Sequence, residues 1–180
     1  MIFEQEIKVP LDRVGVIIGK EGSAKAQIEK LCNVKLEIDS KSGNVKVICD
    51  KDIEEAEPFK AVEIVRAIGR GFSLERALKL LDEETTLEII DLKEYAGKSE
   101  DALVRIKGRI IGLKGKARRV IEDLANVEVS VYGHTAAIIG KVEDVKVASE
   151  AIRMLASGKS HASVYNFLQK SRTKAKIGKI

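Results

Sequence analysis

The sequence predicts an α+β protein built from two tandem units, each with a three-stranded antiparallel sheet packed on helices and an extra helix after it. Three observations lead to this prediction. A 20-residue stretch that begins at Gly15 recurs at Gly108. Strand-like alternation of apolar residues surrounds both copies, and apolar residues at helical spacing fill the intervals between the strands. At 180 residues, the chain is long enough for two small domains that each bury a core.

The repeat needs no gap, because Gly19 and Gly112 lie 93 positions apart and every other pair keeps that offset. Eleven of the 20 paired positions are identical, where ordinary residue usage would give about one or two by chance. The identical residues of the first copy are Gly15, Ile17, Ile18, Gly19, Gly22, Ala24, Ile28, Glu29, Leu31, Asn33 and Val34. The predicted domains are residues 1–82 and 83–170, each including its extra helix, followed by a basic flexible tail over 171–180.

In the first unit, residues 3–9 alternate as a strand, and Pro10 ends it before a helix expected over 11–18. A second helix follows the glycine turn and runs through residue 33. Residues 34–38 and 45–49 form the expected hairpin, and a long helix is expected over 53–68 with Pro58 in its first turn or at a break. Ser73 is a plausible N-cap of the extra helix.

The second unit repeats this order, with a strand over 85–92, a longer connection over 93–101, a hairpin of residues 127–131 and 135–140, and a helix over 142–155. Its extra helix begins with residues 157–160 and places Val164, Phe167 and Leu168 at helical spacing. The two extra helices are expected to pack the two units together, and the alternative is that each covers the back of the sheet of its own unit.

The glycine turns are the candidate binding sites. Glycine permits backbone conformations that other residues resist and leaves room for a close approach. The N-H groups and dipole of the following helix favour a phosphate. Seven Lys or Arg and no acidic residue lie between Arg105 and Arg119. A helix end followed by a solvated basic face would also explain one such turn, but the turn occurs twice.

Ile-Ile-Gly-x-x-Gly, with Ile-Glu six residues on and Asn-Val before a strand, resembles the core of a KH (K-homology) RNA-binding domain, and the element order resembles type I. The resemblance implies that each turn grips the sugar-phosphate backbone while apolar residues read about four nucleotides. The whole chain is similar to archaeal tandem KH proteins related to the small-subunit rRNA processing factor called Partner of Nob One.

The predicted RNA-binding residues are glycines, cations and one leucine in and around the turns: Gly19, Lys20, Gly22, Lys25, Arg105, Lys107, Arg109, Gly112, Leu113, Lys114, Gly115, Lys116, Arg118 and Arg119. Apolar groove candidates, which equally fit the core, are Ile18, Ile28, Leu36, Ile38, Ile111, Ile121, Val129 and Val131. The second turn is predicted to be the stronger site, because Glu21 places a carboxylate in the first.

Composition also limits the mode of RNA binding, the role of the cysteines and the location of the protein. Aromatic residues make up 4% and Trp is absent, which disfavours base stacking on exposed rings. Cys32 and Cys49 fit neither a zinc motif nor a disulfide framework and are expected in the core. With no apolar run long enough for a membrane span, a cytoplasmic protein without membrane association is expected.

No catalytic residue, metal or cofactor is expected, because His134 and His161 have no evident nucleophile or carboxylate arrangement and no P-loop follows the glycines. The preferred function is a non-enzymatic, single-stranded RNA-binding protein in small-subunit rRNA processing. The resemblance implies the 3′ region of that rRNA as ligand, and an rRNA-processing endonuclease or other ribosome assembly or translation factors as partners. A KH-fold interaction scaffold with weak RNA binding and an accessory RNA-turnover factor remain alternatives.

Overall fold

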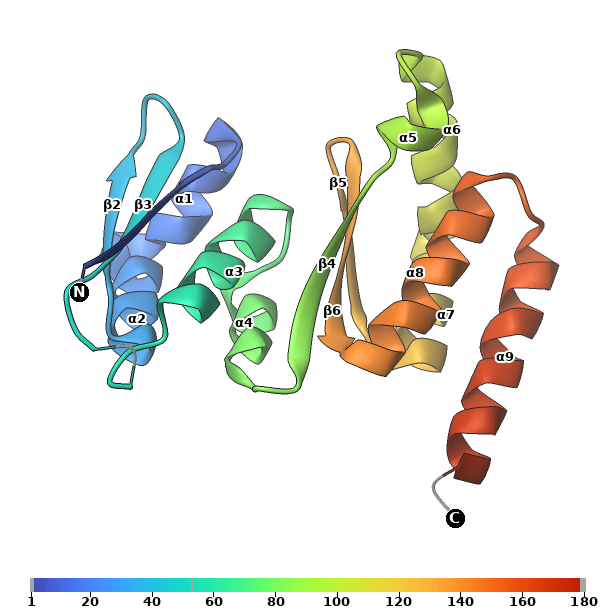
Figure 1. The fold of residues 1–180 in the computed structure, drawn as a ribbon. Coiled ribbons are helices and arrows are strands. Elements are labelled where there is room, and N and C mark those ends of the chain that lie inside the picture. Colours follow the sequence, from blue (N-terminus) through green and yellow to red (C-terminus); the bar gives the residue numbers. More distant parts are fainter. Residues whose placement is uncertain (1, 53, 179–180) are drawn as a thin grey trace. The chain divides into compact units, whose positions relative to one another are not determined.

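The computed structural model describes residues 2–52 and 54–178 and divides the chain into two compact units, Met1–Leu81 and Asp82–Ile180 (Figure 1). Each unit has one three-stranded antiparallel sheet with helices packed on it. The third strand of each unit is central, so the strand orders are β1-β3-β2 and β4-β6-β5. The predicted α+β class and the two repeated units are confirmed.

In the first unit the elements are β1 (Phe3–Lys8), α1 (Leu11–Ile18), the one-turn helix η1 (Lys20–Gly22), α2 (Ser23–Cys32), β2 (Lys35–Asp39), β3 (Asn44–Cys49), α3 (Pro58–Gly69), α4 (Leu74–Ala77) and η2 (Leu78–Leu81). The register pairs Ile7 with Val45 and Leu36 with Val47, and these four residues are buried. The extra segment α4–η2 packs on α3 of its own unit. Ser73 is its N-cap, since Oγ accepts from Arg76 N at 3.2 Å.

Helix α3 begins at Pro58, later than the predicted start at residue 53, and Ile53 itself lies outside the described residues. Proline has no N-H to donate and fits the first helical position, whereas the residue before it avoids the helical region. Glu57 accordingly has φ −126° and ψ 66°. The helix that the apolar spacing predicted therefore begins only at the proline.

In the second unit the elements are β4 (Thr85–Asp91), α5 (Lys93–Ala96), α6 (Glu100–Ile111), η3 (Leu113–Gly115), α7 (Lys116–Ala125), β5 (Glu128–Tyr132), β6 (Thr135–Lys141), α8 (Val142–Ala156) and α9 (His161–Gly178). Helix α9 packs against α7 and α8 and buries Val164 and Leu168 (Figure 1). Both extra segments thus cover helices of their own unit.

The predicted flexible tail is wrong over residues 171–178, because α9 continues through them to Gly178. This stretch contains no proline and is rich in Lys, Arg and Ala, which are good helix formers. Ser171 Oγ also donates to Phe167 O at 2.9 Å. The first turns of α9 are anchored by buried side chains, and the residues that follow favour continuation of the helix beyond residue 170.

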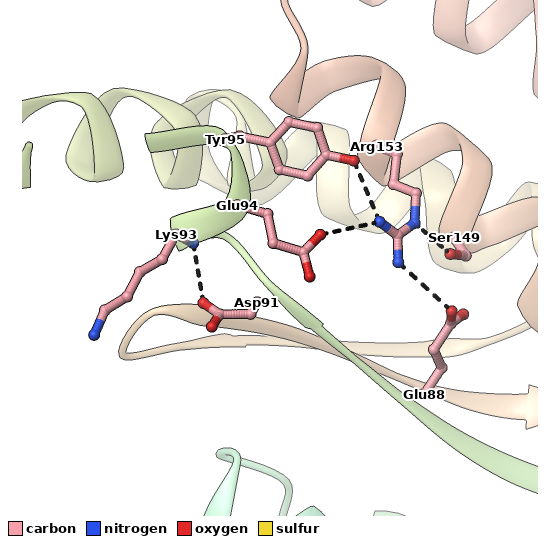
Figure 2. A network of polar contacts seen from close by, with 7 residues as sticks. All are labelled: Glu88, Asp91, Lys93, Glu94, Tyr95, Ser149 and Arg153. Carbon is pink, nitrogen blue, oxygen red and sulfur yellow. Dashed lines mark hydrogen bonds and ion pairs between the residues drawn. The ribbon is translucent and has the colours of Figure 1, made fainter. Parts of the chain in front are cut away.

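The longer connection from β4 to α6 contains α5, which Arg153 of α8 holds in place (Figure 2). One guanidinium nitrogen of Arg153 lies 3.3 Å from the Tyr95 hydroxyl and 3.6 Å from a Glu94 carboxylate oxygen. The same side chain contacts Ser149 Oγ at 3.3 Å and Glu88 of β4 at 3.9 Å. This network positions the segment that leads into α6, where the first unit has only Val9 and Pro10 between β1 and α1.

Both cysteines are buried, as predicted, and burial raises the pKa of the Cys32 thiol to about 11. A thiol with so high a pKa is protonated and unreactive at neutral pH. Cys32 and Cys49 therefore act as small core residues.

Candidate nucleic-acid interface

The two glycine turns, named loop 1 (residues 19–22) and loop 2 (residues 112–115), have the same backbone conformation. The first glycine has φ 74° in loop 1 and 75° in loop 2, with ψ near 180° in both. The third residue, Glu21 or Lys114, also has positive φ, at 55° and 52°. Positive φ is uncommon outside glycine. The repeat therefore preserves a specific turn as well as a sequence pattern.

The first glycine of each loop ends the preceding helix. Gly19 N donates to Gly15 O at 2.9 Å, and Gly112 N donates to Gly108 O at 2.8 Å. A Cβ on Gly112 would lie 2.7 Å from both the backbone nitrogen and the Cβ of Ala117, and Gly19 meets Ala24 in the same way. This close approach explains why glycine and alanine both recur in the repeat.

The last glycine of each loop has a different environment. A Cβ on Gly22 would have no atom within 4 Å, and one on Gly115 would meet only the ends of the Arg118 and Arg119 side chains. The backbone at this position is therefore accessible from solvent. A phosphate can approach it at the start of the following helix.

One helix glycine in each unit, whose carbonyl accepts from the first glycine of the loop, was missed as a site residue by the sequence reasoning, although the repeat contains both. Gly15 lies inside α1 and Gly108 inside α6, and a Cβ on either would have no atom within 4 Å. Glycine inside a helix costs about 1 kcal/mol relative to alanine. The contacts of the described residues do not explain that cost, and both positions are open to solvent.

The seven basic residues of the second copy divide by their contacts. Arg105, Lys114 and Lys116 are exposed beside loop 2, and Lys107 is half-buried. Arg119 Nη1 donates to Lys114 O at 2.9 Å, which braces the loop from within. The exposed cations give loop 2 its positive potential.

Arg109 and Arg118 are tied to the protein, so each guanidinium already uses some of its donors within the fold. Arg109 Nε donates to Leu155 O at 3.1 Å, and its Nη2 donates to Lys159 O, so it holds the end of α8. Arg118 Nη1 lies 2.7 Å from Glu122 Oε1. In the first copy, Lys25 lies 4.0 Å from Glu29, the residue that corresponds to Glu122.

The repeated glutamate joins the helix after each loop to the next strand. Glu29 Oε2 accepts from Leu36 N at 2.9 Å, and Glu122 Oε2 accepts from Val129 N at 2.9 Å. An ionised acceptor makes such a hydrogen bond stronger than a neutral one. The repeated Ile-Glu pair is thus explained by folding.

Four of the eight groove candidates are core residues, and their prediction as groove residues is wrong. Ile28, Leu36, Ile121 and Val129 are at most 1% exposed. Each sits where its helix or strand faces the interior, as apolar residues at regular spacing usually do. The other four candidates, which are half-buried and reach the surface, are Ile18, Ile38, Ile111 and Val131.

Loop 2 borders a pocket between α6 and α9 that the sequence reasoning did not foresee. Its lining comprises Arg105, Gly108, Arg109, Gly112, Leu113, Lys116, Ala117, His161 and Tyr165. Leu113 is 84% exposed, the most of the large apolar side chains in the described part of the chain. His161 had been considered only as a possible catalyst, although its four-residue spacing from Tyr165 would place both rings on one face of a helix.

In the described ranges, 2–52 and 54–178, no cluster of three or more His, Cys, Asp or Glu residues could hold a metal ion. None of the helices described there combines the length and apolar character that a membrane span requires.

Two family models match the chain. One, described as "KH domain", matches residues 4–58, and the other, described as "Eukaryotic type KH-domain (KH-domain type I)", matches residues 86–173. A KH domain-containing protein of Methanocaldococcus jannaschii is 52% identical over 171 residues, which cover 94% of this chain and 74% of the relative.

A chain in the crystal structure of an a/eIF2alpha–aDim2p–rRNA complex from Pyrococcus horikoshii is also similar. It is 45% identical, with a TM-score of 0.89 and 96% of both chains covered. The pre-rRNA-processing protein PNO1 of Yarrowia lipolytica is 29% identical over 122 residues, or 67% of this chain. Since that alignment covers 47% of the Yarrowia protein, the chain spans about half of this relative.

Proposed function

Because this chain belongs to the KH-domain family, we propose that it binds single-stranded RNA and acts, without catalytic activity of its own, in processing of small-subunit rRNA. The observation that carries the proposal is loop 2, an open glycine turn at the start of α7 with exposed cations beside it. Two relatives named above, a pre-rRNA-processing protein and a chain from an rRNA complex, also support a role in rRNA processing. The 3′ region of small-subunit rRNA is the proposed ligand.

Loop 2 is the stronger of the two proposed contacts. Lys114 and Glu21 occupy the same backbone position, so one loop presents an ammonium group where the other presents a carboxylate. Each phosphate that a cation neutralises on a single strand adds about 0.7 to the slope of affinity against salt. Loop 1 has exposed Lys20 to offset Glu21, whereas loop 2 has no acidic residue to offset.

Two pairs of variants test the function and the ranking. Leu113→Asp with Lys114→Asp turns loop 2 into Gly-Asp-Asp-Gly, and Lys20→Asp with Glu21→Asp makes loop 1 identical to it. The single substitutions Lys114→Asp and Lys20→Asp form the second pair, which is matched in charge because each replaces one ammonium group with one carboxylate. Aspartate tolerates the positive φ of the third position.

Affinity for a single-stranded RNA from the 3′ region of small-subunit rRNA would be measured at several salt concentrations, with folding checked by circular dichroism. We expect the loop 2 variants to lose binding and the loop 1 variants to lose less. If the folded variants of both loops bind as the wild type does, the loops do not contact RNA and the proposal is wrong.

A protein-contact role for the first unit is the second candidate. The large apolar side chains of Leu11, Leu31 and Phe59 in this unit are 60%, 47% and 60% exposed. We propose that this unit contacts a protein of the processing machinery, such as an rRNA-processing endonuclease. Titration of a purified endonuclease with wild type and Phe59→Ser would test it, and equal affinities would count against Phe59 as a contact.

A further inference from the structure

The pocket beside loop 2 has α9 as its outer wall, and two contacts fix that wall to α6. His161 Nε2 donates to Arg109 O at 2.8 Å. The Arg109 guanidinium donates to the carbonyl of Leu155, near the end of α8, and to that of Lys159, just before α9. The first turn of α9 is therefore held at a defined position next to the proposed RNA contact.

The lining of the pocket combines aromatic rings with positions that lack bulk. The rings of His161 and Tyr165 lie with centroids 6.1 Å apart at an angle of 60°. The α6 side contributes Gly108 and Gly112, and α7 contributes Ala117. A flat ring can enter such a space without displacing a side chain.

The rim of the pocket is cationic. Arg105 and Lys116 are exposed and line the pocket together with Leu113 of loop 2. No acidic residue occurs among the described residues of the lining. The pocket thus joins an aromatic wall to a positive edge, two features that proteins binding single-stranded nucleic acids combine.

We propose that this pocket takes one further nucleotide of the strand held at loop 2, with its base packed on Tyr165 and its phosphate beside Arg105 and Lys116. The inference rests on the proposed function and extends the bound strand across α6 onto α9. Continuity with loop 2 favours RNA as the occupant, because Gly112 and Leu113 belong to both the loop and the pocket.

The residues of the first unit that correspond to this wall carry no aromatic ring. Aligned on Ser73 and Ser160, which precede the extra helices, His161 corresponds to Leu74 and Tyr165 to Leu78. Arg105 and Lys116 correspond to Asp12 and Ser23 at the offset of the repeat. The additional nucleotide is therefore expected at the second unit alone.

A single introduced tryptophan reports the proposed contact directly, because the chain has none of its own. In Tyr165→Trp, we expect bound RNA to quench the tryptophan fluorescence by stacking, and an abasic substitution at one position of the strand to abolish the quenching. Asn166→Trp is the matched control, since Asn166 is exposed on the same helix and does not line the pocket. Its fluorescence should stay unchanged when the same RNA binds.

Affinity provides the second measurement. Tyr165→Ala and Tyr165→Phe would be compared on RNAs lengthened one nucleotide at a time from either end. At one length, wild type and Tyr165→Phe should gain affinity while Tyr165→Ala remains roughly tenfold weaker, as expected for loss of one stacked base. Shorter RNAs should bind all three proteins equally.

The results separate this inference from the function it rests on. If the loop 2 variants lose RNA, but RNA does not quench the fluorescence of Tyr165→Trp and Tyr165→Ala binds normally at every length, the pocket is not a nucleotide site and the RNA-binding function stands. If the wild type binds no RNA of any length, as read by anisotropy of labelled RNA, both proposals are wrong.

Discussion

Loop 1 and loop 2 have nearly the same backbone but opposite charges at their third residue. Glu21 and Lys114 have φ values of 55° and 52°, and the first glycine of each loop meets an alanine at 2.6 to 2.7 Å from its ideal Cβ position. Lys20 and Leu113, by contrast, share neither charge nor polarity. The repeat keeps the residues that the turn needs sterically and varies those that face solvent, so the two units can differ in ligand while sharing a fold.

Each unit also has an arginine, Arg13 or Arg109, that donates hydrogen bonds to two backbone carbonyls and is called here the arginine brace. The two braces come from different positions of the repeat. The repeat pairs Arg13 with Ile106 and Arg109 with Val16, so the two arginines are not at equivalent positions. Even so, Arg13 donates to the carbonyls of Ile68 and Phe72, four residues apart, and Arg109 donates to those of Leu155 and Lys159, also four apart. Each unit thus fixes the helix before its loop to the end of the helix after its sheet, with an arginine from a different turn.

The largest loss of stability is expected from substitutions at the first glycine, a position that the two loops share. Gly19→Ala and Gly112→Ala each place a Cβ within 2.7 Å of the following helix, in a backbone region that alanine avoids. We expect each to lower the free energy of unfolding of its unit by about 3 kcal/mol, from strain and overpacking together. Chemical denaturation would measure it.

Gly22→Ala and Gly115→Ala are the matched controls, because they also have positive φ but no close backbone atom. Their expected cost is about 1–2 kcal/mol. Equal losses at the first and last glycines would show that the close contact with alanine is not what requires glycine.

The next effect tests the braces. Arg109→Met keeps the apolar stem but removes the hydrogen bonds to Leu155 O and Lys159 O, and we expect a loss of about 2 kcal/mol in stability, measured by chemical denaturation. Arg13→Met should cost a similar amount in the first unit. The dependence of RNA affinity on salt should stay unchanged in Arg109→Met, and a lower slope would show that Arg109 also contacts a phosphate.

The features that the sequence predicted correctly depend on local pattern. The glycine turns, the strands and the N-cap at Ser73 follow from spacing and residue type, and the structure contains all of them. Side-chain partners depend on tertiary contacts instead. Arg109 lies in a basic run, yet its partners are 46 and 50 residues away, and nothing in the local sequence indicates them.

The same limit applies to the apolar residues and to α9. Periodicity places Ile28 and Ile121 on a helix face but does not tell which face is covered, and both are fully buried. The pocket beside loop 2 combines residues of α6, α7 and α9, so its rings were found only when the fold brought α9 to the loop.

An exchange of the third residues sharpens the comparison of the loops. We expect Lys114→Glu to weaken RNA binding about tenfold and to lower the salt slope by about 0.7, because a phosphate contact is lost. Glu21→Lys should strengthen binding a few-fold if loop 1 also touches the strand. The protein with both substitutions keeps the net charge of +4 and is the control for long-range charge effects. If it binds as the wild type does, position within the repeat does not matter and the ranking of the loops is wrong.

The smallest effects are expected at the helix glycines, where stability and binding should change in opposite directions. Gly15→Ala and Gly108→Ala fill open space inside α1 and α6, so each should raise the free energy of unfolding by about 1 kcal/mol. The new methyl group of Gly108→Ala also occupies the surface next to loop 2, so RNA affinity should fall a few-fold. Gly15→Ala should leave affinity nearly unchanged if loop 2 dominates. Thermal denaturation and RNA titration of the same two samples would check both expectations. A Gly108→Ala protein that is more stable and binds RNA as tightly as before would show that no ligand approaches α6 at this glycine.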